Sequence, residues 1–272
     1  MTEVNRKKYR TGVVLSGGGA RGFAHLGVLR ALNEAGIYPE IISGTSAGAL
    51  VGVLYADGYS PDEILLMMNA SSTLHYVRPT VPREGLLQIS GIEKILQDNL
   101  RARKFENLKR PLFVTATDLN RGRAVYFSEG ELLRPVIASA SIPVLFKPVI
   151  IDNTTYVDGG VMDNLPVKPI EDLCQFLVGS YVNPVGREET VTSLVQIAER
   201  AFMLNMSKEL DHKIHKFDLF IAPQELKNYK ILDPEKAVEV FEIGYKETRR
   251  KLSDPGNQKT IEAMLNKEKS TP

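Results

Sequence analysis

Short apolar runs alternate with longer segments whose apolar residues recur at helical spacing along most of the chain. Residues 11–15 form the first such run and predict a buried strand, and residues 23–34 follow with the pattern of a helix buried on one face. Further strands are expected at 41–42, 112–116, 124–127, 149–151, 155–157, 175–182 and 217–221. Further helices are expected at 47–56, after Ser60-Pro61, and at 131–139, 191–215 and 235–252.

Strands that alternate with helices predict an α/β fold, here a three-layer sandwich in which helices flank both faces of a central, mostly parallel sheet. No stretch has the composition of a linker, so we expect residues 1–272 to form a single domain. Recognisable motifs fall within residues 10–170, and C-terminal strands and helices follow at 171–253. The polar tail at 254–272 is expected to fray.

Composition narrows the class of protein. The 272 residues are 43% hydrophobic and 25% charged, as in an ordinary globular domain. The net charge of +1 makes a nucleic-acid partner unexpected. The N-terminus lacks a secretory h-region, and no apolar run reaches the length of about 18 residues that suggests a membrane span. A single cysteine, Cys174, lies in an apolar run and is expected in the core, which fits a cytoplasmic protein.

A glycine-rich loop, Ser16–Gly22, joins the first strand to the first helix. Gly17, Gly19 and Gly22 satisfy the dinucleotide-binding pattern, but that site needs an acidic residue at the end of the second strand, where Ser43-Gly44 stands. Consecutive glycines also let backbone N–H groups converge beside a helix N-terminus, which suits a phosphate or an oxyanion. An anion hole is therefore favoured over a simple tight turn.

The pattern Gly44-Thr45-Ser46-Ala47-Gly48 lies between the second strand and the next helix. In this context G-x-S-x-G is typical of a nucleophile elbow, in which the serine sits on a strained turn. Ser46 could alternatively serve only as the N-cap of that helix. Its pairing with an anion hole just upstream favours the nucleophile.

A nucleophilic serine needs a base. The chain has four histidines: His25, His75, His212 and His215. His25 is expected beside the glycine loop, whereas His212 and His215 lie in a charged segment that resembles a solvated helix face. Asp158 is the better candidate, since it ends an apolar strand and the following glycines would allow close approach to another element. A carboxylate needs burial to become an effective base, so we expect Asp158 to be buried.

Four segments together resemble the patatin-like phospholipase family: Ser16–Gly22, Gly44–Gly48, Ala138–Pro148 and Asp158–Gly160. The resemblance implies a Ser46–Asp158 dyad that cleaves lipid acyl esters through a covalent acyl-enzyme, with no metal and no cofactor. The N–H groups of Gly17, Gly18 and Gly19 would hold the oxyanion, with Arg21 close by. Ser16 stands where many members have aspartate.

The partner implied by the resemblance is a lipid or another acyl ester. Two clusters of apolar residues, at 65–68 and 202–206, could line an acyl channel, although residues of this kind are more often core. A basic cluster at 246–251 would allow transient contact with an anionic membrane surface and peripheral attachment there, although a solvated helix face is the commoner use of such charges.

Three alternatives stay open at this point. A conventional α/β-hydrolase would use a triad of Ser46, Asp158 and His212 or His215, which follow in the right order. A phosphate- or dinucleotide-binding protein would use the glycine loop alone. An inactive lipid-binding relative would need no catalytic residues. The presence of both Ser46 and Asp158 disfavours this alternative.

Overall fold

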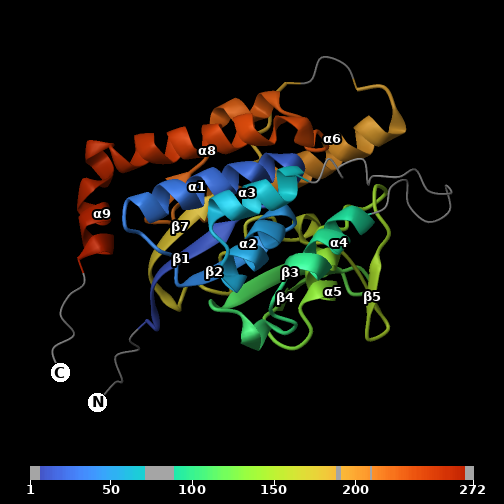
Figure 1. Ribbon diagram of the computed structural model, residues 1–272. Coiled ribbons are helices and arrows are strands. Elements are labelled where there is room, and N and C mark those ends of the chain that lie inside the picture. The colour runs from blue at the N-terminus through green and yellow to red at the C-terminus, as the bar shows by residue number, and fades with distance from the viewer. Residues whose placement is uncertain (1–6, 71–88, 188–190, 209, 267–272) are drawn as a thin grey trace.

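One mixed sheet of eight strands organises the chain, and the computed structural model describes it through residues 7–70, 89–187, 191–208 and 210–266 (Figure 1). The strands are β1 (Tyr9–Leu15), β2 (Ile41–Thr45), β3 (Leu112–Asp118), β4 (Arg123–Phe127), β5 (Val149–Ile151), β6 (Thr154–Asp158), β7 (Cys174–Ser180) and β8 (Leu219–Ile221). Their order is β5-β6-β3-β2-β1-β7-β8, with β4 paired to β3. Strands β3, β2, β1, β7 and β8 are parallel, whereas β4, β5 and β6 pair in antiparallel fashion.

Helices cover this sheet, which confirms the expected α/β class. They are α1 (Phe23–Glu34), α2 (Ala47–Asp57), α3 (Pro61–Ala70), α4 (Ser90–Asn99), α5 (Leu133–Ser139), α6 (Leu194–Ser207), α7 (Leu210–Ile214), α8 (Ala237–Leu252) and α9 (Gln258–Leu265). Figure 1 shows α8 lying along α1 above the sheet, with α2 and α3 on the same side. None of the described helices is long and apolar enough to cross a membrane.

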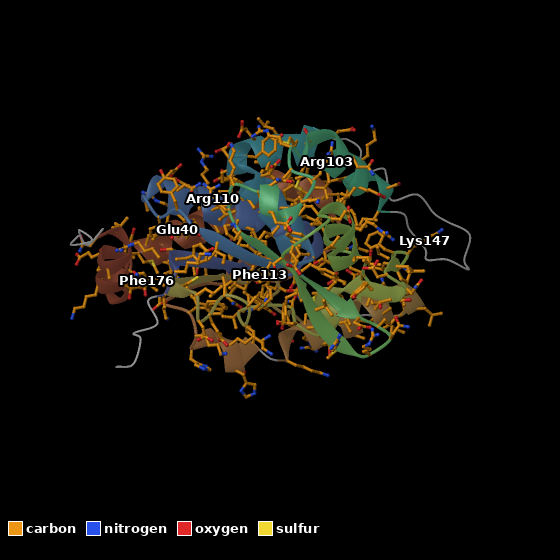
Figure 2. All side chains as sticks on the ribbon, turned by 90° about the horizontal axis from the view of Figure 1, so that it is seen from below. Glu40, Arg103, Arg110, Phe113, Lys147 and Phe176 are labelled. Atoms are coloured by element: carbon orange, nitrogen blue, oxygen red, sulfur yellow. The ribbon has the colours of Figure 1, made fainter. Side chains whose placement is uncertain are left out.

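The two faces of the sheet carry separate cores because neighbouring side chains of a strand point to opposite sides. Val13 and Leu15 of β1 face the larger core beneath α1, α2 and α8, whereas Val14 faces a smaller core on the other side. The turns at 165–170 and residues of α7 and β7 complete that smaller core. In the view from below, Phe113 lies on the sheet, with Glu40 near the amino ends of the strands and Lys147 toward the opposite side of the molecule (Figure 2).

Two expectations for the C-terminal part were wrong. The single helix expected at 191–215 is two helices, α6 and α7. The tail expected to fray from residue 254 instead turns at Pro255–Asn257 and forms α9, whose Ile261 and Met264 are buried in the larger core. Apolar residues at helical spacing in an otherwise polar segment account for that docking.

Strand β3 brings distant parts of the chain together. Its residues 114–118 pair with β4 along one edge, so both β2 and β6 must share the other edge. Thr45, the last residue of β2, lies opposite Thr115, and Asp158, the last residue of β6, lies opposite Ala116. Because β2 runs parallel to β3 and β6 antiparallel, their carboxyl ends meet head to head at consecutive positions of β3.

Helices α1 and α8 cross at two glycines. A Cβ at Gly244 would collide with the backbone of Ala24, and one at Gly27 would collide with the backbone of Phe241 and Tyr245. Backbone cannot move aside as a side chain can, so this crossing requires glycine on both helices.

We therefore expect Gly244→Ala to destabilise the protein, although alanine is the better residue in a helix by about 0.5–1 kcal/mol. The collision should outweigh that gain, with a net loss of about 1–3 kcal/mol in the free energy of unfolding measured in urea. Gly52→Ala in α2 is the control and should destabilise the protein less than Gly244→Ala. A Cβ at Gly52 would meet only side-chain carbons, at 3.2 and 3.3 Å. A Gly244→Ala variant as stable as the wild type would contradict this account.

Candidate active site

Ser46 occupies a strained turn between β2 and α2. Its φ of 53° and ψ of −121° lie where non-glycine residues rarely occur. The flanking glycines permit the turn: a Cβ at Gly44 would lie 2.5 Å from the carbonyl oxygen of Gly48, and a Cβ at Gly48 would collide with the carbonyls of Leu15 and Ser16. The serine therefore stands at the N-terminus of α2, whose partial positive charge favours a developing anion.

Ser139, the last residue of α5, braces this turn. Its buried hydroxyl accepts a hydrogen bond from the Ser46 N–H at 2.8 Å and donates one to the Thr115 carbonyl of β3 at 2.6 Å. One side chain thus ties the elbow to the central strand. Ser46 occupies the N-cap position of α2, but its side chain makes no capping hydrogen bond to that helix.

Asp158 lies fully buried at the end of β6, as expected. Burial raises its pKa from an ordinary value to about 7, although the Ser46 hydroxyl and the Gly160 N–H act in the opposite direction. The Gly160 N–H donates to Oδ1 at 2.8 Å, whereas Oδ2 has no well-aligned hydrogen-bond partner among the described residues. The Ser46 hydroxyl is thus a close neighbour of the carboxylate without regular hydrogen-bond geometry, as is common before substrate binds.

The glycine loop packs against the elbow. A Cβ at Gly17 would lie 3.1 Å from the Ser46 Cβ, and one at Gly22 would lie 2.5 Å from the Ala47 Cβ. The Gly17 N–H, however, donates to the Asn164 carbonyl at 3.2 Å. The N–H groups of Gly18 and Gly19 therefore remain as the candidate oxyanion donors. Gly17 instead allows the loop to pack closely against Ser46.

His25 supports the loop from beneath, next to it as the sequence suggested. Its Nε2 lies 2.8 Å from the Ser16 carbonyl, which can only accept, and its Nδ1 lies 2.7 Å from the Ser180 hydroxyl. Nε2 therefore carries the proton, and burial lowers the pKa of His25 to about 4. The imidazole is therefore neutral and holds the first residue of the loop through a hydrogen bond to its carbonyl.

Arg21 lies in the glycine loop, but its guanidinium binds other segments of the chain. Its buried guanidinium donates to the carbonyls of Tyr229 and Pro184 and to the Asn183 side chain, and it is not among the residues that line the cavity at Ser46. Two residues after Tyr229, the Ile231 carbonyl accepts a hydrogen bond from the Ala20 N–H at 2.7 Å. Arg21 thus anchors the segment that closes one side of the cavity.

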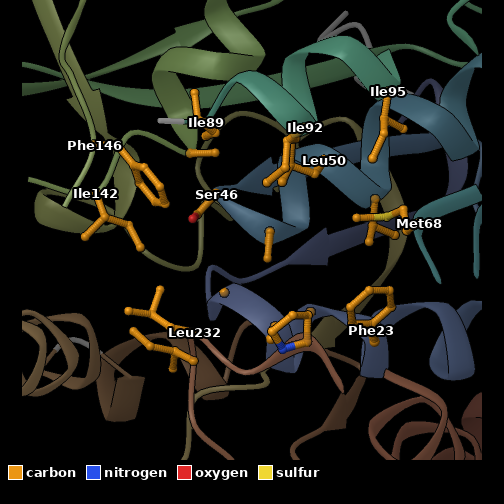
Figure 3. A pocket seen from close by; sticks show the side chains of 18 residues that line it. Phe23, Ser46, Leu50, Met68, Ile89, Ile92, Ile95, Ile142, Phe146 and Leu232 are labelled. Atoms are coloured by element: carbon orange, nitrogen blue, oxygen red, sulfur yellow. The ribbon is translucent and has the colours of Figure 1, made fainter. Parts of the chain in front are cut away.

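A cavity of about 230 Å³ opens beside Ser46, whose hydroxyl points into it (Figure 3). Apart from Ser46 and the glycine loop, the walls are almost wholly apolar and include Phe23, Leu50, Met68, Ile92, Ile142 and Phe146. The walls come from α1, α2, α3 and α4 and from the segment after α5. An extended apolar group bound here would end at the serine.

Two of the histidines are not brought to this site. His212 and His215 are exposed, neither lines the cavity, and neither makes a hydrogen bond to Ser46 or Asp158. His75 lies outside the described residues. Within the described ranges, no group of three His, Cys, Asp or Glu side chains is placed to hold a metal.

Two residues of the site were not singled out in the sequence. Ser139 lies inside a segment that carried the family resemblance, but nothing in the pattern indicated its bond to the elbow. Asn164 lies six residues after Asp158, and its side-chain oxygen approaches both Gly17 and Gly160. The signal for Asn164 was its place in the turn after the glycine pair.

Comparison with known proteins agrees with this geometry. The model of the patatin-like phospholipase family matches residues 13–170, a range that includes the glycine loop, Ser46 and Asp158. An uncharacterized NTE family protein of Mycobacterium tuberculosis is 35% identical over 164 residues, which are 59% of this chain and 45% of that protein. The lysophospholipase nte1 of Emericella nidulans is 35% identical over 174 residues, 60% of this chain and 11% of that protein.

The fold is also similar to a solved structure, VipD from Legionella pneumophila, with a TM-score of 0.52 and 18% identity over 90% of this chain and 67% of that chain. The chain spans less than half the length of the mycobacterial and fungal relatives that it matches. The matched family model nevertheless covers more than half of this chain and contains the glycine loop, Ser46 and Asp158. The chain belongs to the patatin-like phospholipase family.

Proposed function

We propose that this protein is a serine hydrolase of lipid acyl esters, of the phospholipase A or carboxylesterase kind, with Ser46 as nucleophile and Asp158 as base. The observation that carries the proposal is a strained serine beside a buried aspartate whose pKa lies near 7, at the mouth of an apolar cavity. A general base works best when its pKa lies near the working pH.

Acylation follows from this arrangement. Asp158 takes the Ser46 proton as Oγ attacks the ester carbonyl, and the carbonyl oxygen becomes an oxyanion. In this proposal the N–H groups of Gly18 and Gly19 and the N-terminus of α2 stabilise that charge. Asp158 then gives its proton to the departing alcohol, which leaves an acyl group on Ser46.

The cavity supports a lipid substrate. Its apolar walls suit a fatty acyl chain rather than a phosphate, which also argues against the dinucleotide- or phosphate-binding alternative. The relative from Emericella nidulans is named a lysophospholipase, which fits a single-chain acyl ester. Membrane contact through the basic cluster is less well supported, because Arg249 and Arg250 already face Glu34 and Glu247.

We expect Ser46→Ala to abolish hydrolysis of p-nitrophenyl esters and labelling by a fluorophosphonate, because both reactions need the serine oxygen. Asp158→Ala should reduce both strongly, by about 100-fold or more, because it removes the base. Rates of ester hydrolysis and of covalent labelling, followed by intact mass, provide the measurement.

His212→Ala and His215→Ala are the matched controls and should retain activity. Loss of activity in either one would favour the triad over the dyad. A wild-type protein that neither hydrolyses esters nor reacts with the fluorophosphonate would contradict the proposed function.

The apolar cavity predicts a preference for longer acyl chains. Each additional buried CH₂ contributes about 0.8 kcal/mol, or roughly a fourfold rise in kcat/KM, until the cavity is full. Met68→Trp should shift the preferred chain length downward, because Met68 lines the cavity. Leu66→Trp on the same helix is the control, since Leu66 is 67% exposed, and an equal shift in both variants would show that the cavity does not hold the chain.

The pH profile tests the base. Asp158 accepts a proton only when ionised, so kcat/KM should rise about tenfold per pH unit up to about pH 7 and level off above it. Histidine is the commonest general base in enzymes, so the profile is also measured in His212→Ala and His215→Ala. The rise should persist in both; if it disappears in one of them, that histidine and not Asp158 is the group that titrates.

A further inference from the structure

A second cavity of about 220 Å³ lies on the Asp158 side of the site and differs in character from the first. It lies between the turn that follows β6 and the helices α6 and α7, and its walls include Gly160, Asn164, Tyr181, Asn205 and Met206. Polar groups form much of its surface. Its volume is enough for several water molecules, each of which occupies about 30 Å³ in the liquid.

Buried polar groups without partners point to what this cavity holds. Asn164 is 5% exposed, and neither its Oδ1 nor its Nδ2 has a hydrogen-bond partner among the described residues. The hydroxyl of Tyr181, a residue 2% exposed, is likewise unpaired within that part of the chain. Leaving such a group unsatisfied costs about 1–3 kcal/mol, so polar groups gathered at one cavity indicate a hydrogen-bonding occupant.

Asn164 connects this cavity to the dyad. A Cβ at Gly17 would lie 2.5 Å from Asn164 Oδ1 and 3.1 Å from the Ser46 Cβ. A Cβ at Gly160 would lie 3.2 Å from Asn164 Oδ1 and 3.1 Å from Asp158 Oδ1. The Asn164 amide oxygen therefore lies against the same two glycines that contact the nucleophile and the base.

The reaction needs a route of this kind. Once Ser46 is acylated, the acyl chain fills the apolar cavity, whose walls offer water few hydrogen bonds. Hydrolysis nevertheless requires a water molecule beside Asp158, and Asp158 Oδ2 is buried without a well-aligned partner among the described residues. The second cavity, with the unpaired polar atoms of Asn164 and Tyr181 in its walls, is a source from which such a water could reach that oxygen.

We propose that the second cavity binds water and supplies the hydrolytic water molecule, which the Asn164 amide orients toward the acylated Ser46. This rests on the proposed function. Asn164 is a positioning residue, since it orients the water and transfers no proton. The Tyr181 hydroxyl holds further water in the same cavity.

Deacylation then transfers the acyl group from Ser46 to water. Asp158 accepts one proton from the water, and the water oxygen forms a bond to the acyl carbon. The bond between that carbon and Ser46 Oγ breaks, and Oγ recovers the proton from Asp158. The fatty acid leaves, and both side chains return to their starting states.

The test is Asn164→Leu, which keeps the shape of the side chain and removes its polar atoms. Formation of the acyl-enzyme from p-nitrophenyl decanoate, whose chain is long enough to occupy the apolar cavity, should continue at the wild-type rate, whereas its hydrolysis should slow by about 10- to 100-fold. Rapid mixing and intact mass would then show acyl-enzyme accumulating on Ser46. Hydroxylamine, a stronger nucleophile than water, should restore turnover, measured as the hydroxamate.

Asn33→Leu is the matched control, because that amide accepts from the Tyr55 hydroxyl away from the dyad, and it should change neither step. Tyr181→Phe should slow deacylation in the same sense, and it carries the test if Asn164→Leu fails to fold. Equal slowing of acylation and deacylation, or no accumulation of acyl-enzyme, would overturn the role of the cavity. A wild type that forms no acyl-enzyme would refute the proposed function, and this proposal with it.

Discussion

The site depends on one constraint in the sheet, the division of a single edge of β3 between two strands. β2 occupies the first half of that edge and β6 the second, and they approach from opposite directions. Their last residues therefore lie opposite Thr115 and Ala116, so Ser46 and Asp158 become neighbours although 112 positions separate them in the sequence. Hydrogen bonds of the sheet, rather than contacts between the two side chains, set this proximity.

Glycines make the remaining approach possible. Around the dyad, the loop after β1, the elbow and the turn after β6 come so close that a Cβ at Gly17, Gly48 or Gly159 would collide with a neighbouring segment. The same principle recurs where α1 and α8 cross. The cavity beside Ser46 therefore lies in a rigid frame, and its apolar walls come from helices attached to that frame.

Much of this could be predicted from the sequence. Apolar periodicity predicted the order of most strands and helices, and the glycine motifs singled out Ser46, Asp158 and the loop, which the structure brings together. Local patterns could not show what depends on contacts between distant segments: the bond of Ser139 to the elbow, the capture of the Gly17 N–H by Asn164, and the turn of Arg21 toward Tyr229. The docking of α9 was missed for a related reason, since two apolar residues in a polar tail have meaning only where a core is open to receive them.

The shared edge of β3 also bears on synthesis of the protein. While a chain is being made, its N-terminal segments can fold before the rest has emerged. The elbow and the glycine loop belong to the first quarter of this chain, yet Asp158, the proposed base, follows with β6, beyond the midpoint. On the proposed mechanism, a partly synthesised chain therefore presents the serine without the aspartate that would activate it, and reactivity towards lipids develops only after β6 has joined the sheet.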